Sequence, residues 1–318
     1  MERILIIGST GQIGSELAMH LRGIYGNDNV VAGYIPAAPP KGVLLESGPA
    51  EVVDITNPQQ IADAVSKYKV DTIFNLAALL SAVAENKPQL AWKIGLGGLF
   101  NTLEVAREMN CAVFTPSSIG AFGYDTHKHN TPQDTIQRNN TMYCLTKVSG
   151  DLIIDYYFKR FGVDTRSVRF PGLISNVTPP GGGTTDYAVD IYYKAVQEGS
   201  FVCPIKAGTY MDMMYMPDAL RGIVELMEAD PSKLKHRNSF NVTSMSFEPE
   251  MIYASIKKRL PHFTMTYEVD DLRQAIAESW PNSLDDSCAR EEWGWKPTYD
   301  LDAMTDDMIK VMTARFKK

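Results

Sequence analysis

The first residues of the chain constrain its fold most, because an apolar run is followed by regularly spaced glycines. Residues 3–7 read Arg-Ile-Leu-Ile-Ile, and the loop after them carries Gly8, Gly11 and Gly14. A short run of β-branched residues is typical of a strand buried on both faces of a parallel sheet. Apolar residues then recur at helical spacing over residues 13–21. These features predict a strand, a tight turn and a helix, which is how a doubly wound α/β domain begins.

The same loop indicates a class of ligand. Glycines let backbone N–H groups approach a pyrophosphate closely, and the N-terminus of a helix adds partial positive charge beside it. The spacing here is GxxGxxG, whereas the standard dinucleotide fingerprint is GxGxxG. A strand–turn–helix with incidental glycines is the alternative interpretation. The agreement of strand, loop and helix favours a dinucleotide.

Predicted strands and helices alternate along the first half of the chain. We expect further strands at 30–34, 51–54, 72–76, 112–116 and 165–170, and helices at 58–67, 87–109 and 141–161. Strands separated by helices imply a parallel sheet with right-handed crossovers. The predicted fold is therefore α/β, with a Rossmann doubly wound domain at residues 1–170. Shorter, mixed segments at residues 171–318 predict a smaller C-terminal substrate-binding lobe, with some segments returning to the Rossmann sheet.

Composition narrows the range of partners. The 318 residues carry a net charge of -7 and no basic run, which argues against nucleic acid. No apolar stretch is long enough to span a membrane. The four cysteines lie far apart without metal-ligand spacing, so we expect reduced thiols and no metal site. A first strand at residue 3 predicts a cytoplasmic protein, or one of the mitochondrial matrix if a eukaryotic transit peptide has been removed.

Tyr143 and Lys147 stand four residues apart in a predicted helix. A tyrosine hydroxyl loses its proton near pH 10, so it acts as a base near neutrality only beside a positive charge. A spacing of four residues places both side chains on one helical face. The lysine can therefore lower the phenol pKa and also contact a cofactor ribose. An exposed helix pair is the alternative, but the position between the fifth and sixth predicted strands favours function.

Ser117 and Ser118 follow the fifth predicted strand directly. At that edge of a parallel sheet, either hydroxyl can hydrogen-bond a substrate oxygen. A loop or cap would be the ordinary role of such a pair. Together with Tyr143, Lys147 and the glycine loop, the serines predict a nicotinamide-dependent oxidoreductase.

The chain resembles the extended short-chain dehydrogenase/reductase superfamily over nearly its whole length. The motifs that carry this resemblance are Gly8, Gly11 and Gly14; Asp54; 75–78 (Asn-Leu-Ala-Ala); Ser117 and Ser118 with Phe122 and Gly123; Tyr143 and Lys147; and 169–172 (Arg-Phe-Pro-Gly). The strings at 169–175, 180–188, 213–219 and 279–287 are similar to the short-chain-type L-threonine 3-dehydrogenases. This resemblance implies oxidation of the L-threonine side-chain alcohol by NAD to 2-amino-3-ketobutyrate.

The resemblance also implies a role for individual residues. Tyr143 would be the general base, Lys147 would tune it and hold the nicotinamide ribose, and Ser118 or Ser117 would orient the substrate hydroxyl. The implied cofactor-binding residues are Gly8, Gly11, Gln12, Ile13, Gly14, Tyr34, Asp54, Ile55, Leu76, Ala77, Ala78, Tyr143, Lys147 and Pro171. The implied substrate-binding residues are Ser81, Ser118, Tyr143, Gly183, Thr184, Thr185 and Trp280. A homodimer that pairs the helices at 87–109 and 141–161 is implied as well.

Two positions depart from the pattern of the superfamily. The second strand usually ends in an acidic residue that binds the adenosine ribose, but Gly33 and Tyr34 stand there. Tyr34 either packs on the adenine or is simply an aromatic residue at a strand end. No arginine beside it could bind a 2′-phosphate, so NAD is favoured over NADP. Gly95 stands where an asparagine is common, which removes the side chain that a proton relay would use.

Two other functions remain open from the sequence. One is a nucleotide-sugar epimerase or dehydratase of the same superfamily, which would normally need basic residues in the C-terminal lobe for a pyrophosphate. The stretch Asp212-Met213-Met214-Tyr215 is apolar and acidic there. The other is a non-catalytic NAD-sensing protein. Such proteins often lose the tyrosine or the lysine, and both are present here.

Overall fold

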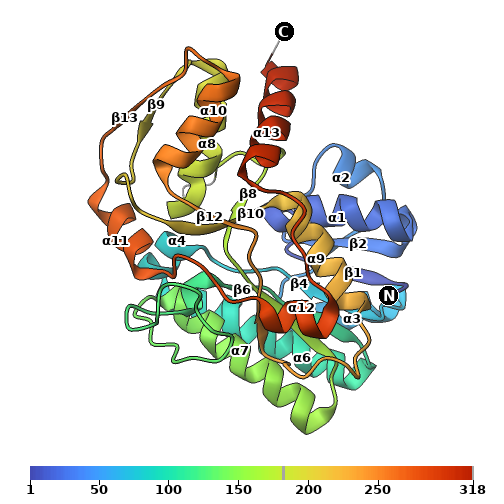
Figure 1. The fold of residues 1–318 in the computed structure, drawn as a ribbon. Helices are drawn as coiled ribbons and strands as arrows, with labels where there is room; N and C mark the ends of the chain where they lie inside the picture. Colours follow the sequence, from blue (N-terminus) through green and yellow to red (C-terminus); the bar gives the residue numbers. More distant parts are fainter. Residues whose placement is uncertain (181–182, 317–318) are drawn as a thin grey trace. The chain divides into compact units, whose positions relative to one another are not determined.

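The computed structural model describes residues 1–180 and 183–316, which fall into two compact units (Figure 1). The N-terminal unit consists of Met1–Ala121, Asn140–Arg169 and Leu220–Phe240. The C-terminal unit consists of Phe122–Asn139, Phe170–Ala219 and Asn241–Lys318. The functional roles predicted for residues 1–170 and 171–318 remain predictions.

The N-terminal unit is built on a sheet of eight strands. Across the sheet they lie in the order β11 Ser239–Asn241, β7 Thr165–Phe170, β5 Ala112–Phe114, β4 Thr72–Asn75, β1 Ile4–Ile7, β2 Val30–Tyr34 and β3 Ala50–Val52. The short strand β6, Ser117–Ser118, pairs with β7. Strand β1 runs parallel to both β2 and β4, with Ile7 opposite Gly33 and Asn75. This is the strand order of the Rossmann fold, so the predicted fold class is confirmed.

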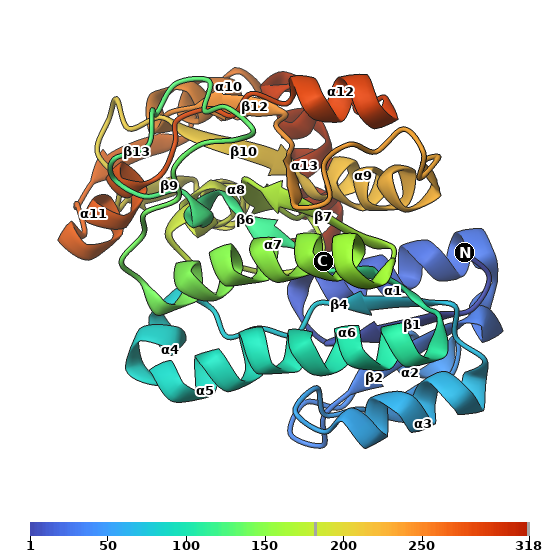
Figure 2. The ribbon, with the colours of Figure 1, turned by 90° about the horizontal axis from the view of Figure 1, so that it is seen from below.

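Helices cover both faces of this sheet. The longer ones are α1 Gln12–Tyr25, α3 Pro58–Tyr68, α6 Gly98–Met109, α7 Met142–Phe161 and α9 Met216–Glu228, the last of which continues from the C-terminal unit. The short ones are η1 Asn27–Asn29, α2 Val43–Glu46, α4 Ser81–Asn86, α5 Pro88–Trp92 and η3 Ile119–Ala121. Figure 2 shows α6 and α7 side by side, and the two helices pack on each other. Apolar residues of α3, α6 and α7 pack with strand residues in one core, including Leu5, Ile73, Val65, Leu103 and Ile154.

The helix predicted at residues 87–109 is interrupted. Lys93–Gly97, which we label η2, forms a π-helical turn between α5 and α6. An ideal Cβ on Gly95 would lie 3.1 Å from the Cβ of Thr146 on α7, so only glycine permits this close approach without displacement. An ideal Cβ on Gly98 would similarly lie 2.7 Å from the Ile55 side chain. Glycines at these positions therefore let the segment pack tightly against its neighbours where a regular helix was expected.

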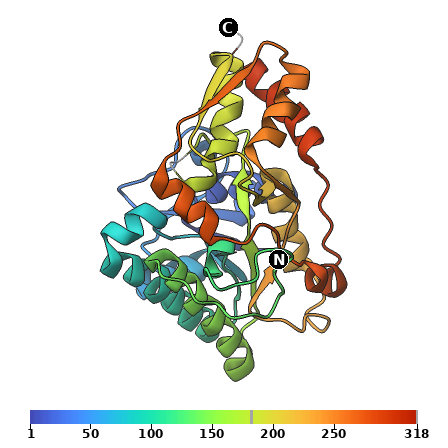
Figure 3. The ribbon, with the colours of Figure 1, turned by 60° about the vertical axis from the view of Figure 1, so that its left-hand side comes forward.

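The C-terminal unit contains two small sheets and most of the remaining helices. Its strands are β8 Gly172–Ile174, β10 Met211–Tyr215 and β12 Met245–Phe247 in one sheet, and β9 Ser200–Cys203 and β13 Thr264–Tyr267 in the other. Its helices are η4 Thr184–Asp186, α8 Tyr187–Gln197, α10 Pro249–Arg259, α11 Asp271–Ser279, α12 Ser287–Trp293 and α13 Leu301–Phe316. Figure 3 shows the red C-terminal helix α13 next to the orange α10, against which it packs. Tyr192, Ile252 and Met308 belong to the apolar core that joins α8, α10 and α13.

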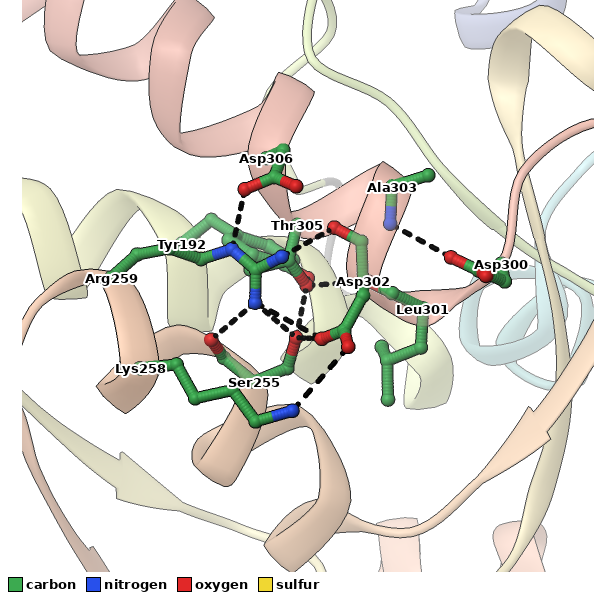
Figure 4. Close-up of polar contacts among 10 residues, drawn as sticks. All are labelled: Tyr192, Ser255, Lys258, Arg259, Asp300, Leu301, Asp302, Ala303, Thr305 and Asp306. Carbon is green, nitrogen blue, oxygen red and sulfur yellow. Dashed lines mark hydrogen bonds and ion pairs between the residues drawn. The ribbon is translucent and has the colours of Figure 1, made fainter.

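Polar contacts fasten α13 to α10 at the surface (Figure 4). The Arg259 guanidinium lies 2.6 Å from Asp306 and 3.0 Å from Asp302. Beneath it, the Ser255 hydroxyl donates to Asp302 at 2.6 Å and lies 3.0 Å from the Thr305 hydroxyl. These groups link the end of α10 to the first turns of α13. Among the described residues, no helix is both long and apolar enough to cross a membrane.

Candidate active site

The glycine loop between β1 and α1 is held tightly by its neighbours. Gly8 has a φ of +84°, and an ideal Cβ on it would lie 2.9 Å from the backbone nitrogen of Ala77. An ideal Cβ on Gly14 would lie 2.2 Å from the Gly8 carbonyl oxygen. The Gly33 carbonyl accepts hydrogen bonds from the backbone N–H groups of Gly8 and Ser9. Glycine at positions 8 and 14 is therefore required by the fold itself.

Gly11 differs from these two glycines. An ideal Cβ on Gly11 would meet only the Gly8 carbonyl oxygen, at 3.5 Å, which is an ordinary contact. Gly11 is also the N-cap of α1, and no side chain caps that helix. No side chain therefore caps the first backbone N–H groups of α1, at Gln12 and Ile13. This is the arrangement that a helix N-terminus needs to receive a pyrophosphate.

The residues predicted to bind the adenosine lie at the ends of β2 and β3. Tyr34 is half-buried and ends β2 opposite Val52 of β3. Asp54 follows β3, and its Oδ1 accepts hydrogen bonds from the N–H and the hydroxyl of Thr56, each at 2.9 Å. Ile55 is buried, and its carbonyl accepts a hydrogen bond from the Asn101 side chain at 3.0 Å. The turn at Asp54 is thus fixed next to the end of β2, where a dinucleotide-binding sheet holds its adenosine.

Leu76, Ala77 and Ala78 follow β4 at the same edge of the sheet. The Leu76 N–H donates to the Ile7 carbonyl at 2.9 Å, which ties this segment to the end of β1. The segment therefore runs directly beside the glycine loop. The structure brings these predicted cofactor-binding residues together around one edge, within the N-terminal unit.

The first turns of α7 carry the predicted catalytic pair. Thr141 caps the helix by accepting a hydrogen bond from the Cys144 N–H at 3.3 Å. The Lys147 ammonium donates to the Pro116 carbonyl at 2.7 Å and lies 5.5 Å from the centroid of the Tyr143 ring. The Tyr143 hydroxyl hydrogen-bonds the Ser118 side chain. The tyrosine, the lysine and one serine are therefore assembled at the end of β6.

The protonation equilibria of this pair are set mainly by burial. Burial raises the pKa of Tyr143 to about 12, and the hydrogen bond with Ser118 opposes this shift. Burial lowers the pKa of Lys147 to about 8, and the charge of Asp151 opposes that shift. The expected lowering of the Tyr143 pKa by Lys147 is not seen, because burial raises this pKa and the ammonium bonds the Pro116 carbonyl instead. A further positive charge beside the phenol would be needed for it to act as a base near neutrality.

The two serines differ in their surroundings. Ser118 contacts Tyr143 and also accepts a hydrogen bond from the Gly120 N–H at 3.1 Å. Ser117 is buried, and its hydroxyl has no hydrogen-bond partner among the described residues. The side-chain oxygen of Asn75, at the end of β4, is buried in the same way. Both residues line a small cavity of about 20 Å³ that Lys147 also lines.

The predicted substrate-binding residues of the C-terminal unit lie at two places within it. Gly183 precedes η4, where its N–H donates to Asp186 at 2.8 Å. Thr185 packs its methyl group on β8, since an ideal Cβ on Gly172 would lie 2.7 Å from it. Trp280 follows α11 and is half-buried, and Pro171 lies between β7 and β8. The side chains of Ser81 and Thr184 lie outside the described residues.

A buried polar cluster that the sequence did not predict lies behind Lys147. Asp151, one turn further along α7, forms an ion pair with Arg169 of β7, with Nε and Oδ2 3.0 Å apart. The Ser239 hydroxyl donates to the other carboxylate oxygen at 2.6 Å and lies 2.6 Å from the Ser167 hydroxyl. Extending the four-residue spacing of Tyr143 and Lys147 by one more step would have found Asp151. No sequence signal marks Ser239 as its neighbour.

Comparison with known proteins agrees with this geometry. The chain belongs to the NAD dependent epimerase/dehydratase family, which matches residues 4–243. It is 54% identical over 317 residues to an uncharacterised epimerase/dehydratase of Staphylococcus saprophyticus, covering 100% of this chain and 99% of the relative. The membership makes NAD the cofactor, and the open approach to Gly11 and the free N-terminus of α1 fit that molecule.

Solved structures give a narrower likeness. The L-threonine dehydrogenase of Clostridium difficile superposes with a TM-score of 0.95 at 57% identity, covering 99% of this chain and 98% of that one. The L-threonine dehydrogenase of Phytophthora infestans gives a TM-score of 0.94 at 43% identity, covering 99% and 100%. A metagenomic L-threonine 3-dehydrogenase described as monomeric also matches, with a TM-score of 0.92 at 39% identity over 98% and 99% of the two chains.

Proposed function

We propose that this protein is an NAD-dependent L-threonine 3-dehydrogenase. The observation that carries the proposal is the assembled group of Tyr143, Lys147 and Ser118, in which the tyrosine hydroxyl already bonds the serine. Such a group suits removal of a proton from an alcohol during its oxidation. The choice of L-threonine as the substrate rests on the likeness to solved L-threonine dehydrogenases over nearly the whole chain.

In this proposal each side chain has one task. Ser118 hydrogen-bonds the substrate hydroxyl and orients it toward the Tyr143 oxygen. Tyr143 accepts the hydroxyl proton while the carbon–hydrogen bond of the carbinol carbon breaks. Lys147 would hold the nicotinamide ribose and stabilise the phenolate form of Tyr143 that exists before the proton is taken up. NAD, when bound, would supply the hydride acceptor, and the positive charge of its nicotinamide would lower the Tyr143 pKa from its buried value. The product is 2-amino-3-ketobutyrate.

The remaining predicted residues complete the proposed site. Gly8, Gly11, Gly14 and the helix N-terminus would hold the pyrophosphate, and Tyr34, Asp54 and Ile55 the adenosine. Ser81, Gly183, Thr184, Thr185 and Trp280 would contact the amino acid. The assignment of these substrate contacts rests on the resemblance. L-threonine carries both an ammonium and a carboxylate, and polar groups of the protein must bind them.

The proposal is tested with purified protein by following NADH formation with L-threonine and, separately, conversion of UDP-glucose to another nucleotide sugar, a reaction that leaves no net NADH. We expect turnover with L-threonine and none with UDP-glucose, which a nucleotide-sugar enzyme of the family would prefer. The kcat/KM with NAD should exceed that with NADP. NAD binding without turnover of any amino acid would support the NAD-sensing alternative instead. Activity on UDP-glucose alone would reject the threonine assignment.

A homodimer is part of this proposal. Exposed apolar side chains lie on α5, α6 and α7, namely Leu90, Trp92, Phe100, Leu145, Leu152 and Tyr156. The three on α7 follow one another by seven and four residues, so they share a face. An apolar face of this kind suits pairing with a second copy. Light scattering should give twice the chain mass, and Leu152→Lys should reduce it to one chain. The matched variant Leu272→Lys, on exposed α11, should leave the dimer intact.

A further inference from the structure

The face of α7 that carries Tyr143 and Lys147 continues to a third ionisable group. Asp151 follows Lys147 by four residues, so the three side chains lie along one face of the helix. Lys147 and Asp151 line the same cavity of about 20 Å³. That volume is enough for about one water molecule. The carboxylate and the ammonium therefore border the same small space.

The carboxylate of Asp151 is fixed in place from the other side. Its side chain is 3% exposed, and that of Arg169 is 2% exposed, so the ion pair between them is fully buried. Ser239 of β11 donates to the second carboxylate oxygen at 2.6 Å. Burying such a pair costs much of what its attraction returns, so stability alone is a weak reason to keep it. Its place one turn behind the catalytic lysine suggests a different reason.

We propose that Asp151 is a positioning residue for Lys147: its carboxylate, held by Arg169 and Ser239, keeps the lysine ammonium charged and directed along the face of α7 that carries Tyr143. This inference rests on the proposed function, since it concerns the same catalytic group. It adds a residue that touches neither substrate nor cofactor and acts only through Lys147.

The electrostatics of the site support this role. Burial lowers the pKa of Lys147 to about 8, and Asp151 is the foremost group that raises it. A buried lysine without that support would lose its proton near neutrality and could no longer stabilise a phenolate. The charged and titratable groups around this end of α7 are Tyr143, Cys144 and Asp151 on the helix itself, Glu85 on α4 and Arg169 on β7.

The cavity that Lys147 and Asp151 line has room for one water molecule. Asn75 and Ser117 each present a buried polar atom with no hydrogen-bond partner among the described residues, and both line the same space. A water molecule bound there would satisfy these atoms and reach the lysine and the carboxylate. Such a water would connect Asp151 to Lys147 through the space that both residues line.

The test changes the charge of Asp151 while keeping its shape. Asp151→Asn removes the negative charge and retains an oxygen for Ser239. The ionisation of Lys147 is read by competitive labelling of amines with acetic anhydride at a series of pH values, followed by mass spectrometry of the Lys147 peptide. This readout needs no substrate, so it stands even if the threonine assignment fails. We expect the midpoint for Lys147 to fall by about one pH unit in the variant.

Two further variants serve as controls. Asp151→Glu keeps the charge and should restore the midpoint. Asp155→Asn removes a negative charge from the same helix, where it pairs with Lys159 at 2.6 Å, and should leave the midpoint unchanged. If Asp151→Asn does not fold, Asp151→Asn with Arg169→Gln removes both buried charges and should still lower the midpoint. A midpoint that stays or rises in the variants without the aspartate overturns the proposal.

The pH profile of turnover gives an independent reading if threonine is the substrate. Loss of the lysine charge raises the pKa of the phenol, so the rising limb of kcat/KM should move to higher pH by about one unit. If Asp151 acted directly on Tyr143 as an anion, its removal would move the limb to lower pH. A purely structural role would lower kcat/KM at every pH without moving the limb. Either of these last two results rejects the positioning role.

Discussion

Two arginine–aspartate clusters, one in each unit, use the same chemistry in opposite surroundings. Arg169 and Asp151 are buried between α7 and β7, with side chains 2% and 3% exposed. Arg259 joins Asp302 and Asp306 at the surface between α10 and α13, where the two carboxylates are 53% and 66% exposed (Figure 4). Water screens the second cluster and not the first. We therefore expect the surface cluster to contribute little to stability, and the charge of the buried one to act on its neighbours without screening.

The largest effect on turnover should come from removing the Tyr143 hydroxyl, on the same helical face as the buried Asp151. Tyr143→Phe keeps the packing of α7 and removes only the ionisable hydroxyl. We expect turnover with L-threonine to fall by about 10²–10⁴-fold while NAD affinity is retained. Steady-state kinetics and an NAD titration measure the two quantities. Near-normal turnover would show that Tyr143 is not the general base, and the buried cluster would then have no catalytic group to support.

The next effect separates the two arginines directly. Arg169→Gln leaves the Asp151 carboxylate buried without its guanidinium, and breaking a buried pair in this way costs about 3–5 kcal/mol. The free energy of unfolding in urea should fall by that amount. Added salt should change this loss little, because the site is shielded from ions. A loss below about 1 kcal/mol would mean that the buried charges are solvated after all.

A smaller effect is expected from the serine that supports the buried carboxylate. Ser239→Ala removes a hydrogen bond to a charged group, for which about 1.5–3 kcal/mol is typical. The urea midpoint should fall by less than in Arg169→Gln, because the ion pair remains. Ser246→Ala, which removes a hydroxyl bonded to the Asn282 carbonyl in the C-terminal unit, provides a neutral control. If the control loses as much stability, the charge of Asp151 adds nothing to the Ser239 bond.

The smallest effect should be that of Arg259→Gln, the same substitution in the exposed cluster. Surface ion pairs contribute little each, so the urea midpoint should move only slightly, and high salt should reduce the difference further. A loss as large as that of Arg169→Gln would contradict the distinction between the clusters.

The dependence of stability on acidic pH tests the exposed cluster in a second way. Hydrogen bonds from Ser255 and Arg259 lower the pKa of Asp302 to about 2. Because the folded value is depressed, the stability that Asp302 contributes is complete above its unfolded pKa near 4 and is lost as pH falls toward 2. The stability of wild type and of Arg259→Gln should therefore converge in that window. Divergence on acidification would show that the arginine acts by some means other than these carboxylates.

Much of the N-terminal unit follows from local patterns. Alternating strands and helices predict the parallel sheet, and the predicted strand at residues 30–34 and helix at 141–161 nearly match β2 and α7. The interruption at Lys93–Gly97 could not be predicted, because an apolar helical pattern does not show one added residue in a turn. The glycines there mark close packing only once Thr146 is known to lie opposite.

The grouping of the candidate catalytic residues could be predicted where local patterns place them. Helix spacing puts Tyr143 and Lys147 on one face, and a strand end brings up Ser117 and Ser118, between which the sequence does not choose. The polar cluster around Asp151 could not be predicted. Ser239 lies 88 residues from Asp151 and comes close to it only because of the position of β11 in the sheet. Serine and arginine at those positions carry no pattern of their own. Long-range polar contacts of this kind depend on strand order, which local sequence does not encode.

The π turn at Lys93–Gly97 sets the rotational phase between the two helices that it joins. An α-helix advances about 100° per residue, so one residue more or less turns everything beyond it by that angle. The turn therefore lets Trp92 of α5 stay exposed while Leu99 and Leu103 of α6 point into the core. Deleting Gly97 would regularise the helix and rotate one of these faces out of place. A single-residue deletion here would thus exchange buried for exposed side chains along a whole helix, which no substitution at the same position could do.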